Sequence, residues 1–416
     1  MNAQQARIEA ERCLQCFDAP CTQACPAQIR IPTFISMIRS GNVRGAAEVV
    51  RSANALASTC GKICPQEVFC QAVCTRAQLD SAIDIRGLHF FATQFEVRGG
   101  YSTTRSFPAS GKKVAVIGAG PAGLACAFEL AKFGHRVDVY ERGRPGGVPR
   151  NSIPAFRLSD GELDADTLFL TRYLNVKRRM IDAVAFRRIR KSHNAVFLAV
   201  GLGKDRRLGI PGEKLKGILP VLKFLETARR SPARVNIGKT VIVIGGGNVS
   251  LDAAATARRL GATRVTLIYR RSEKEMRVWK SELEEARRVG VEIRFLTNPV
   301  ELVGSGRVRG IRCRQTRLSR KKDASGRPIP AEIPGTETVL AADTVILAIG
   351  QTMQADWLKD VRRTGSGYVA VNRRFQTSLS GVFAGGDMIA GEGTIVQSVA
   401  HGKHAAHAIH AFLARH

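Results

Sequence analysis

The segment from Lys112 to Glu141 constrains the fold more strongly than any other part of the chain. It begins with an apolar run at 114–117, continues through the turn Gly118-Ala119-Gly120-Pro121-Ala122-Gly123, and then contains no Gly or Pro as far as Phe133. This order predicts a strand, a tight turn and a helix, followed by a second strand that ends at Glu141. In such a turn the glycines allow a sharp bend, the approach of a pyrophosphate and close helix–strand packing, while the terminal carboxylate binds ribose hydroxyls. The segment therefore predicts an α/β fold with a site for a dinucleotide.

A second segment, residues 239–271, repeats the same order. Its turn reads Gly245-Gly246-Gly247-Asn248-Val249-Ser250, and its second strand ends in Arg270-Arg271 where the first ends in an acid. Arginine at this position accommodates the 2′-phosphate of NADP(H), so the pair favours NADP(H) over NAD(H), with Arg277 as a further candidate contact. Solvated loop arginines are the alternative interpretation. One of the two segments is expected to hold FAD and the other a nicotinamide dinucleotide.

Eight of the ten cysteines precede residue 75, in two runs with short spacings. The runs are Cys13-x2-Cys16-x4-Cys21-x3-Cys25-Pro26 and Cys60-x3-Cys64-Pro65-x5-Cys70-x3-Cys74. Four-member runs that end in Cys-Pro are typical of iron–sulfur ligation, and they predict two 4Fe-4S clusters on a helical segment that includes 31–50, with zinc as the alternative. Disulfides belong to secreted chains, and the polar N-terminus here predicts a cytoplasmic protein.

The charge balance raises the question of a polyanionic partner. The chain has 64 Lys and Arg against 35 Asp and Glu, a net charge of +29, with basic clusters at 177–179, 187–191 and 317–322. No zinc finger, basic zipper or aromatic RNA-binding motif accompanies this charge, so a solvated surface or an acidic protein partner is favoured over nucleic acid. No apolar run is long enough to span a bilayer.

The remaining segments complete the expected α/β pattern. Buried strands are predicted at 195–201 and 344–350, a hairpin at 292–316 and an exposed loop at 321–335. A short strand at 382–387 delivers Gly386 and Asp387, and a helix follows over 394–407. Asp387 is a candidate for the flavin ribityl chain, although a capping role in a turn is the alternative, and the helix N-terminus at Thr394 and Ile395 would stabilise a reduced flavin ring.

Two cysteines and a group of four histidines are predicted to have structural roles and not to bind a metal. Cys126 and Cys313 lie outside the two runs, and we expect both to be core residues. His401, His404, His407 and His410 recur every three residues, which rotates each by about 60° from the one before on a helix. The four imidazoles therefore cannot share one metal ion.

These motifs together resemble one family, the iron–sulfur flavoproteins that include the small subunit of bacterial glutamate synthase and the N-terminal half of dihydropyrimidine dehydrogenase. The resemblance covers nearly the whole chain and rests on the cysteine runs, GAGPAG with Glu141, IPAFRL at 153–158, GGGNVS with its two arginines, AIG at 348–350, and AGGD with TIVQSVAHGK at 384–403. It implies a small helical iron–sulfur domain followed by two Rossmann-like domains, the second inserted in the first. The implied bounds are 1–98 for the iron–sulfur domain, 99–111 for a linker, 112–237 and 341–416 for the FAD domain, and 238–340 for the NAD(P)H domain.

The resemblance also implies roles for individual residues. The first turn would bind FAD together with Val148 and Arg157, and the second would bind NAD(P)H together with Ala348, Ile349 and Gly350. One cluster would take Cys13, Cys16, Cys21 and Cys74, and the other Cys25, Cys64 and Cys70. In the dihydropyrimidine dehydrogenase branch a Gln supplies the last ligand, and His89 stands at that position here, with Cys60 as the rival.

Within the family, the DAPC segment at 18–21 and the five-residue gap before Cys70 look like the dihydropyrimidine dehydrogenase branch. That branch implies an electron-input subunit that takes a hydride from NAD(P)H onto FAD and passes single electrons through the clusters. A separate catalytic subunit with FMN and further clusters would then reduce uracil or thymine, so a hetero-oligomer without membrane attachment is expected. A glutamate synthase small subunit is the alternative enzyme, and a nucleic-acid-binding iron–sulfur redox sensor is the alternative that is not an enzyme.

Overall fold

The computed structural model describes residues 1–99, 108–323, 325–391 and 393–415. The chain forms two compact units: residues 1–150, 155–202 and 353–416 make up unit 1, and residues 151–154 and 203–352 make up unit 2. Of the predicted linker at 99–111, residue 99 and residues 108–111 are among the described residues, and the rest lies outside them. No helix in the described part of the chain is both long and apolar enough to cross a membrane.

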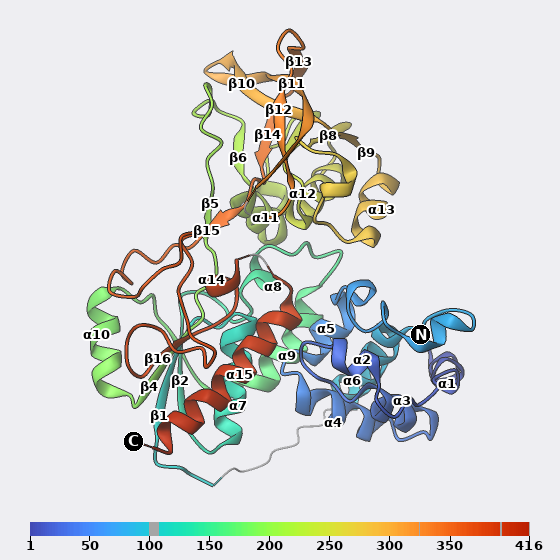
Figure 1. Cartoon of the computed structure of the whole chain (residues 1–416), viewed down its shortest axis with the longest axis vertical. Helices are drawn as coiled ribbons and strands as arrows, with labels where there is room; N and C mark the ends of the chain where they lie inside the picture. Colours follow the sequence, from blue (N-terminus) through green and yellow to red (C-terminus); the bar gives the residue numbers. More distant parts are fainter. Residues whose placement is uncertain (100–107, 324, 392, 416) are drawn as a thin grey trace. The chain divides into compact units, whose positions relative to one another are not determined.

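The first part of unit 1 is helical and carries the two cysteine runs (Figure 1). Its helices are α1 (Ala3–Glu11), α2 (Pro20–Ala24), α3 (Ile31–Arg39), α4 (Val43–Ala53), α5 (Ala57–Ile63) and α6 (Ile85–Gly99), with short 3-10 turns at Gln66–Val68 and Thr75–Gln78. The helix expected over 31–50 is divided in two, because Gly41 adopts a positive φ of 81° and ends α3. The side chain of Asn42 then accepts a hydrogen bond from the Gly45 amide and starts α4.

The second part of unit 1 is built on a parallel sheet with the strand order β16-β4-β1-β2-β3. The strands are β1 (Lys113–Ile117), β2 (Arg136–Glu141), β3 (Asn175–Arg178), β4 (Ala195–Leu198) and β16 (Val382–Ala384). The chain moves to β2 and β3 on one side of β1 and to β4 and β16 on the other. This arrangement places a topological switch point at the carboxyl end of β1, which is where α/β sheets bind ligands.

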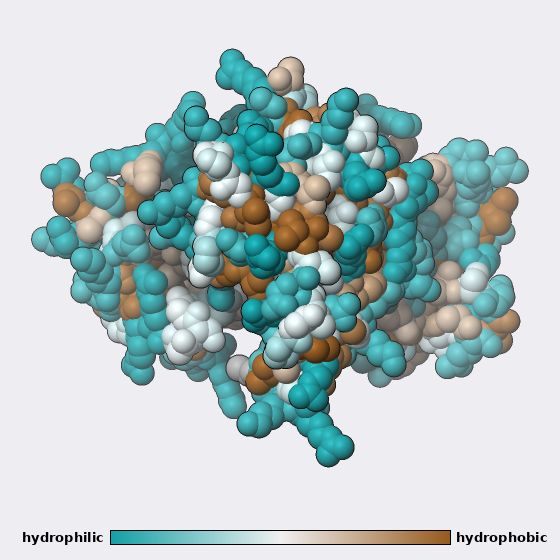
Figure 2. Space-filling model, turned by 90° about the horizontal axis from the view of Figure 1, so that it is seen from above, coloured by the Kyte–Doolittle hydropathy of each residue, from teal (hydrophilic) through white to brown (hydrophobic). Residues whose placement is uncertain are grey.

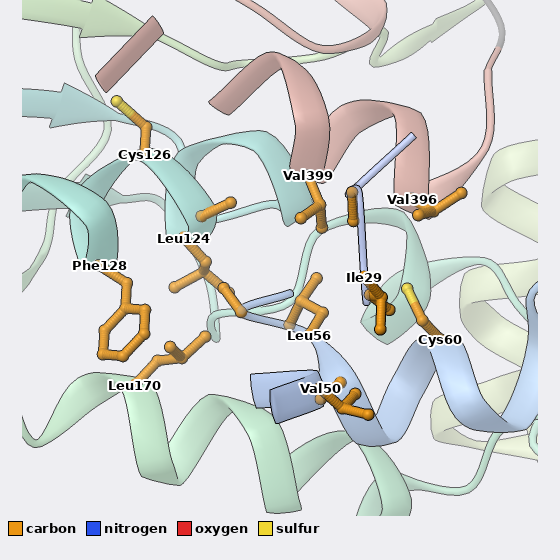
Figure 3. Packing of buried hydrophobic residues seen from close by; sticks show 14 of the residues in the cluster. Ile29, Val50, Leu56, Cys60, Leu124, Cys126, Phe128, Leu170, Val396 and Val399 are labelled. Atoms are coloured by element: carbon orange, nitrogen blue, oxygen red, sulfur yellow. The ribbon is translucent and has the colours of Figure 1, made fainter. Parts of the chain in front are cut away.

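Helices cover this sheet and join it to the cysteine-bearing part. They are α7 (Pro121–Lys132), α8 (Val148–Asn151), α9 (Asp160–Thr171), α10 (Ala183–Ser192), α14 (Asp387–Ala390) and α15 (Ile395–Leu413). The α15 helix packs along α7, and the contact is so close that a Cβ on Gly402 would lie 2.2 Å from the Ala122 carbonyl oxygen. One continuous hydrophobic core includes Leu56 and Ile29 of the cysteine-bearing part together with Leu124 and Val399 of the sheet part (Figure 3).

Unit 2 contains the second parallel sheet, with the order β6-β14-β7-β8-β9. Its strands are β6 (Ile218–Pro220), β7 (Thr240–Ile244), β8 (Arg264–Ile268), β9 (Val291–Arg294) and β14 (Thr344–Leu347), and its helices are α11 (Val221–Arg230), α12 (Asn248–Arg259) and α13 (Lys280–Arg288), with 3-10 turns at Pro232–Arg234 and Glu273–Glu275. Strand β5 (Lys204–Asp205), where the chain enters the 203–352 segment, pairs antiparallel with β15 (Gln351–Thr352), where the chain leaves it. Because unit 2 is entered and left between strands of the first sheet, the insertion of one domain in the other is confirmed.

The bounds of the units differ from those expected at 237 and 340. Strand β14 was expected in the returning FAD domain, but it pairs in parallel with β7 on one side and β6 on the other. This pairing buries all four residues of β14 inside unit 2. The compact unit therefore runs from 203 to 352, and unit 1 resumes at Met353.

An antiparallel sheet completes unit 2. It contains β10 (Thr297–Ser305), β11 (Arg307–Lys322), β12 (Pro328–Glu332) and β13 (Thr338–Ala341). The hairpin predicted at 292–316 is confirmed from Thr297 to Gln315, whereas residues 292–294 belong to β9 of the parallel sheet. The loop expected at 321–335 is wrong in part, because β12 pairs with β11 through Arg317↔Ala331.

Candidate functional site

The first turn has the geometry of a pyrophosphate cradle. Gly118 adopts a φ of +103°, and a Cβ there would lie 2.4 Å from the Ala199 carbonyl oxygen. A Cβ on Gly123 would lie 1.9 Å from the Gly118 oxygen, so α7 can approach β1 only without that side chain. Gly120 differs, since a Cβ built there would have the Gly147 Cα, at 3.7 Å, as its nearest contact outside its chain neighbours among the described residues. The helix N-cap at Gly120 also has no side-chain cap, which leaves the first amides of α7 available to an anion.

Glu141 closes the ribose side of this cradle. Its Oε2 accepts a hydrogen bond of 2.8 Å from the Ala119 amide, and its Oε1 accepts one of 2.8 Å from the Gly143 amide. The carboxylate therefore lies at the mouth of the turn, at the end of β2, where an acid binds ribose hydroxyls.

A second glycine pair adds to the cradle, although spacing alone assigned it no chemistry. The Gly146 amide donates to the Ala119 carbonyl at 2.8 Å, and a Cβ on Gly147 would lie 2.7 Å from the Gly120 Cα. Val148 follows directly and begins α8. The adjacent glycines were the available signal for this contact. Arg157 is half-buried in the segment between α8 and α9, and its role at the flavin stays a prediction.

The segment after β16 reaches the same cradle. Gly386 has a φ of +75°, and a Cβ there would lie 3.0 Å from the Ala122 Cβ, so the start of α14 lies against the start of α7. Asp387 begins α14, and its Oδ1 accepts a hydrogen bond of 3.3 Å from the Ser398 hydroxyl. Thr394 caps α15 through a reciprocal pair of hydrogen bonds with Gln397, directly before Ile395. The structure thus brings Asp387 and the N-terminus of α15 to the first cradle.

The second turn forms a matching cradle in unit 2. A Cβ on Gly245 would lie 2.3 Å from the Ala348 oxygen, and one on Gly246 would lie 2.2 Å from the Tyr269 ring. Gly247 is the N-cap of α12 and offers no side-chain cap to the first amides of that helix. Ser250, in place of the third glycine, is fully buried and donates its hydroxyl to the Gly247 carbonyl at 2.5 Å.

The neighbours of this second turn are also fixed by hydrogen bonds. The Asn248 side chain accepts from the Trp279 amide at 2.9 Å, next to the half-buried Val249. The Ala348 amide donates to the Ile244 carbonyl at 2.8 Å, which brings the segment of Ile349 and Gly350 to the carboxyl end of β7.

The three arginines beside the second cradle have different surroundings. Arg271 is buried, and its guanidinium contacts Asp323 Oδ2 at 2.6 Å and the Pro328 carbonyl at 2.8 Å. Arg270 exposes part of its side chain, and partial desolvation of its guanidinium, together with the nearby charges of Arg271 and Arg327, lowers its pKa. Arg277 is exposed beside the turn, where its amide donates to the Gly246 carbonyl at 3.3 Å and its guanidinium to the Ser325 carbonyl at 3.0 Å.

The first predicted set of cysteines lines one cavity. Cys13, Cys16, Cys21 and Cys74 share it with the apolar side chains of Ile31, Ile35, Ile83 and Ile85. Burial, followed by the proximity of the other three thiols, raises the pKa of Cys21 to about 11. Four thiolates in such a cavity need a metal centre to offset their charge, so the donor set fits a cluster.

The second set of cysteines lies together as well, with one addition. The pKa of Cys64 is raised by burial and then by its neighbours Cys60, Cys70 and Cys25. Burial likewise raises the pKa of Cys60 and of Cys70 to about 12. Cys60 therefore stands among the three predicted ligands.

His89 belongs to α6 and packs against α5 at Gly61, the residue after Cys60. A Cβ on Gly61 would lie 3.2 Å from its Cδ2, its side chain is only 6% exposed, and its Nε2 has no hydrogen-bond partner. Burial lowers the pKa of His89 to about 4, so the imidazole is neutral, as a metal ligand must be. An unpaired buried nitrogen fits a ligand role, and both His89 and Cys60 remain open.

Within the described residues, no three His, Cys, Asp or Glu side chains converge as ligands of a single ion. The α15 histidines point to different surroundings: His410 pairs with His135 at 3.0 Å, whereas His401 and His404 contact Phe375. Cys126 and Cys313 are fully buried core residues, as expected.

Comparison with known proteins extends these assignments to the whole chain. Residues 1–100 match the 4Fe-4S family described as dihydropyrimidine dehydrogenase domain II, and residues 112–409 match the pyridine nucleotide-disulphide oxidoreductase family. The chain is 36% identical to the NAD-dependent dihydropyrimidine dehydrogenase subunit PreT of Escherichia coli over 97% of its own length and 93% of that protein. It is 33% identical to the glutamate synthase [NADPH] small chain of the same organism, over 97% of its own length and 91% of that protein.

A further relative and a solved structure complete the comparison. The chain is 37% identical to the beta subunit of NADP(+)-dependent formate dehydrogenase of Moorella thermoacetica, of which it spans 60%. Among solved structures, FprA from Mycobacterium tuberculosis in complex with NADPH matches 73% of this chain and 85% of its own, with a TM-score of 0.63 and 20% identity, which shows a shared fold. The chain therefore belongs to the NAD(P)H-dependent iron–sulfur flavoprotein oxidoreductases, the family of the glutamate synthase small chain and the N-terminal part of dihydropyrimidine dehydrogenase.

Proposed function

We propose that this chain is the electron-input subunit of a bacterial-type dihydropyrimidine dehydrogenase, which delivers electrons from NAD(P)H to a separate catalytic subunit that reduces uracil or thymine. That subunit would carry FMN and further iron–sulfur clusters. The observation that carries the proposal is the pair of cysteine sets packed on the same compact unit as the FAD cradle. The five-residue gap from Cys64 to Cys70 supports the pyrimidine branch.

The residues of the first cradle would bind FAD in a fixed orientation. The amides of α7 and the open space at Gly120 would hold the pyrophosphate, and Glu141 would hold the ribose. Asp387 and the N-terminus of α15 would lie at the ribityl chain and the ring, where a helix N-terminus favours negative charge. Bound there, FAD supplies the conversion between the electron pair of NAD(P)H and the single electrons that clusters accept.

The residues of the second cradle would bind the nicotinamide dinucleotide. The amides of α12 at Gly247, Asn248 and Val249 would meet the pyrophosphate, and the segment 348–350 would line the approach to it. The exposed Arg270 and Arg277 would contact a 2′-phosphate, which favours NADP(H). Arg271 would act indirectly, because its guanidinium is already bonded to Asp323.

The two cysteine sets would hold two 4Fe-4S clusters. Cys13, Cys16, Cys21 and Cys74 would ligate the first cluster. Cys25, Cys64 and Cys70 would ligate the second, with His89 as the fourth ligand and Cys60 as the alternative.

The test is to isolate the native partner and to assay the complex. We expect affinity capture of this chain under anaerobic conditions to recover an FMN-containing partner, and the complex to oxidise NADPH or NADH when uracil is added. Recovery of a large amidotransferase subunit, with glutamate formed from glutamine and 2-oxoglutarate, would support the glutamate synthase alternative instead. DNA binding with a steep dependence on salt, in a chain that fails to reduce dye acceptors with NADPH, would support the redox sensor.

A further inference from the structure

Helix α15 connects the FAD cradle to the second cysteine set. Its N-terminus at Thr394 and Ile395 lies at the cradle, and Val396, Val399 and Lys403 follow at helical spacing on one face. Figure 3 shows Val399 directed towards Leu56 of the cysteine-bearing part, and Val396 belongs to the same hydrophobic core as Ile29 and Cys60. Lys403 continues this face by one turn, so its side chain enters the same contact.

Lys403 is fixed there by two backbone carbonyls. Its ammonium donates to the Ala27 oxygen at 3.2 Å and to the Ala53 oxygen at 3.4 Å. Ala27 is two residues beyond Cys25, and Ala53 is the last residue of α4. The side chain is half-buried, and Cys25 beside it is buried, with an exposed fraction of 8%.

The positive charge of Lys403 has no close anion to offset it. Among the residues that the structure describes, no carboxylate lies within ion-pairing distance of its ammonium, and the nearby Glu129 is paired with Lys132 at 2.7 Å. Burial lowers the pKa of Lys403, and its charge and that of Cys25 act on each other. The other charged groups at this contact are paired: Asp166 of α9 with Arg51 at 2.6 Å, and Lys62 of α5 with Glu162 at 2.9 Å. Lys403 is therefore an uncompensated cation beside the second cysteine set.

Such a cation favours the more negative, reduced form of an iron–sulfur cluster, because net charge and hydrogen bonding set its reduction potential. We propose that Lys403 is a positioning residue that holds the Cys25 segment against the FAD domain and raises the reduction potential of the cluster bound there, so that this cluster accepts electrons from FAD. The inference rests on the proposed function, because it requires a cluster at Cys25. In this step the cluster gains one electron, the reduced flavin loses one, and Lys403 keeps its proton.

The test is an anaerobic redox titration of the full chain loaded with FAD and clusters, followed by electron paramagnetic resonance. Lys403→Met removes the charge at similar length, Lys403→Gln removes it but keeps hydrogen-bond donors, and Lys403→Arg keeps it. Lys132→Met combined with Glu129→Gln is the matched control, since it removes a cation of the same interface together with the anion that is already paired with it. We expect the Met and Gln variants to lower the potential of one cluster by about 59 mV, which is a tenfold change in the equilibrium constant of a one-electron step. Arg should restore the potential, and the control should change neither cluster.

Unshifted potentials in the Gln variant, or equal shifts of both clusters, would overturn the inference. If the Met variant loses iron, the Gln and Arg variants decide the question, because their side chains keep hydrogen-bond donors for the two carbonyls. A wild-type chain that binds neither flavin nor iron would defeat the proposed function itself, whereas a fully loaded chain with unshifted variants would defeat the role of Lys403 alone.

Discussion

Arg270 and Arg271 are adjacent in the sequence, but they differ in burial and in their partners. We expect Arg270→Ala to lower the affinity for NADPH about tenfold or more, because a charge-assisted hydrogen bond to a phosphate contributes about 1.5–3 kcal/mol. The KM for NADH should stay unchanged, and steady-state assays with a dye acceptor measure both values. Equal increases for the two nucleotides would contradict a 2′-phosphate contact.

Arg271→Ala should act on stability before it acts on binding. Its guanidinium is 3% exposed and bonded to Asp323 and Pro328, so removal leaves buried groups without their partner. Breaking such a pair destabilises the fold, although less than breaking a fully buried pair would, because Asp323 is partly exposed. Thermal denaturation should show a lower midpoint for Arg271→Ala than for Arg270→Ala, and the reverse order would show that the buried pair is dispensable.

His89 and Cys60 are the two candidates for the fourth ligand of the second cluster, and single substitutions distinguish them. If His89 is the ligand, His89→Ala should lose the second cluster and reduce the iron content from about eight to about four atoms per chain, whereas Cys60→Ala should retain both clusters. If Cys60 is the ligand, the two variants exchange their outcomes. Iron analysis and electron paramagnetic resonance measure the difference, with Cys126→Ala as the control for a buried cysteine outside both sets.

At this scale the sequence predicted chemistry better than it predicted contacts. The sequence was sufficient to recognise the two turns, Glu141 and the cysteine runs, because their chemistry requires fixed residue types at fixed spacings. The contact of Gly147 with Gly120 was missed, because it joins segments that only the folded sheet brings together. The burial of Arg271 was missed for the same reason, since Asp323 lies far along the chain.

At the scale of single elements, α5 depends on a side chain from another part of unit 1. Asp166 of α9 is fully buried, and its carboxylate accepts from the Ser58 amide at 3.1 Å, the Thr59 amide at 2.7 Å and the Arg51 guanidinium at 2.6 Å. The first turn of α5 is thus capped by a residue of the FAD domain. This cap fixes the helix that carries Cys60 and ends at Cys64.

Asp166→Asn should therefore destabilise the chain and loosen the second cluster. We expect a loss of about 3 kcal/mol, because the variant leaves Arg51 with one fewer anion in a buried site. Calorimetry and the rate of iron loss to a chelator measure the two effects. Asp356→Asn, at an exposed carboxylate of unit 1 outside α5 and α9, is the control and should change stability by less than about 0.5 kcal/mol. Equal iron retention in the two variants would exclude a role for the cap at the cluster.

The same scale shows where element prediction failed. The hairpin at β10 and β11 was predicted because glycines mark its turn, whereas β12 was missed because its Pro-rich sequence, Pro328 to Glu332, reads as a loop. Among the described residues it is an edge strand, and it pairs with the end of β11. The division between α3 and α4 follows from Gly41, whose positive φ is a property of the turn and not of the helical periodicity on either side.

For the whole molecule, the distribution of cores predicts two separate responses to loss of iron. One core runs through the cysteine-bearing part and the first sheet, whereas unit 2 has cores of its own around β7 and around β10 and β11. Iron-free chain should therefore show a lower melting transition for unit 1 and an unchanged transition for unit 2. Calorimetry with and without NADP+ identifies the second transition, because a bound ligand raises it. A single shifted transition would show that the two units unfold together.

The division into domains also belongs to this scale. The order of an iron–sulfur part, an FAD part and an inserted dinucleotide part followed from motifs, since each motif marks one domain. The bounds did not, because β14 can be assigned to either sheet until its partners β6 and β7 are known.

The net charge of +29 is also a property of the whole chain. On the face shown in Figure 2, hydrophilic side chains form most of the outer surface. On α10 the cations of Arg187, Arg188, Arg190 and Lys191 are exposed, and none of them forms an ion pair within the described residues. A catalytic subunit that binds such a chain gains from an acidic surface, because opposite charges accelerate association.

We therefore expect association of the two subunits to slow as salt is added, while dissociation changes little, since screening acts on long-range attraction between exposed charges. Stopped-flow mixing over a salt series measures the association rate. Charge reversal by Arg187→Glu with Arg188→Glu should lower that rate about tenfold if α10 faces the partner, and the same reversal at Arg287 and Arg288, which are already paired with glutamates, should have a smaller effect. An association rate that does not depend on salt would mean that the excess charge serves another anionic ligand, and duplex DNA in the same titration would then be the competitor to examine.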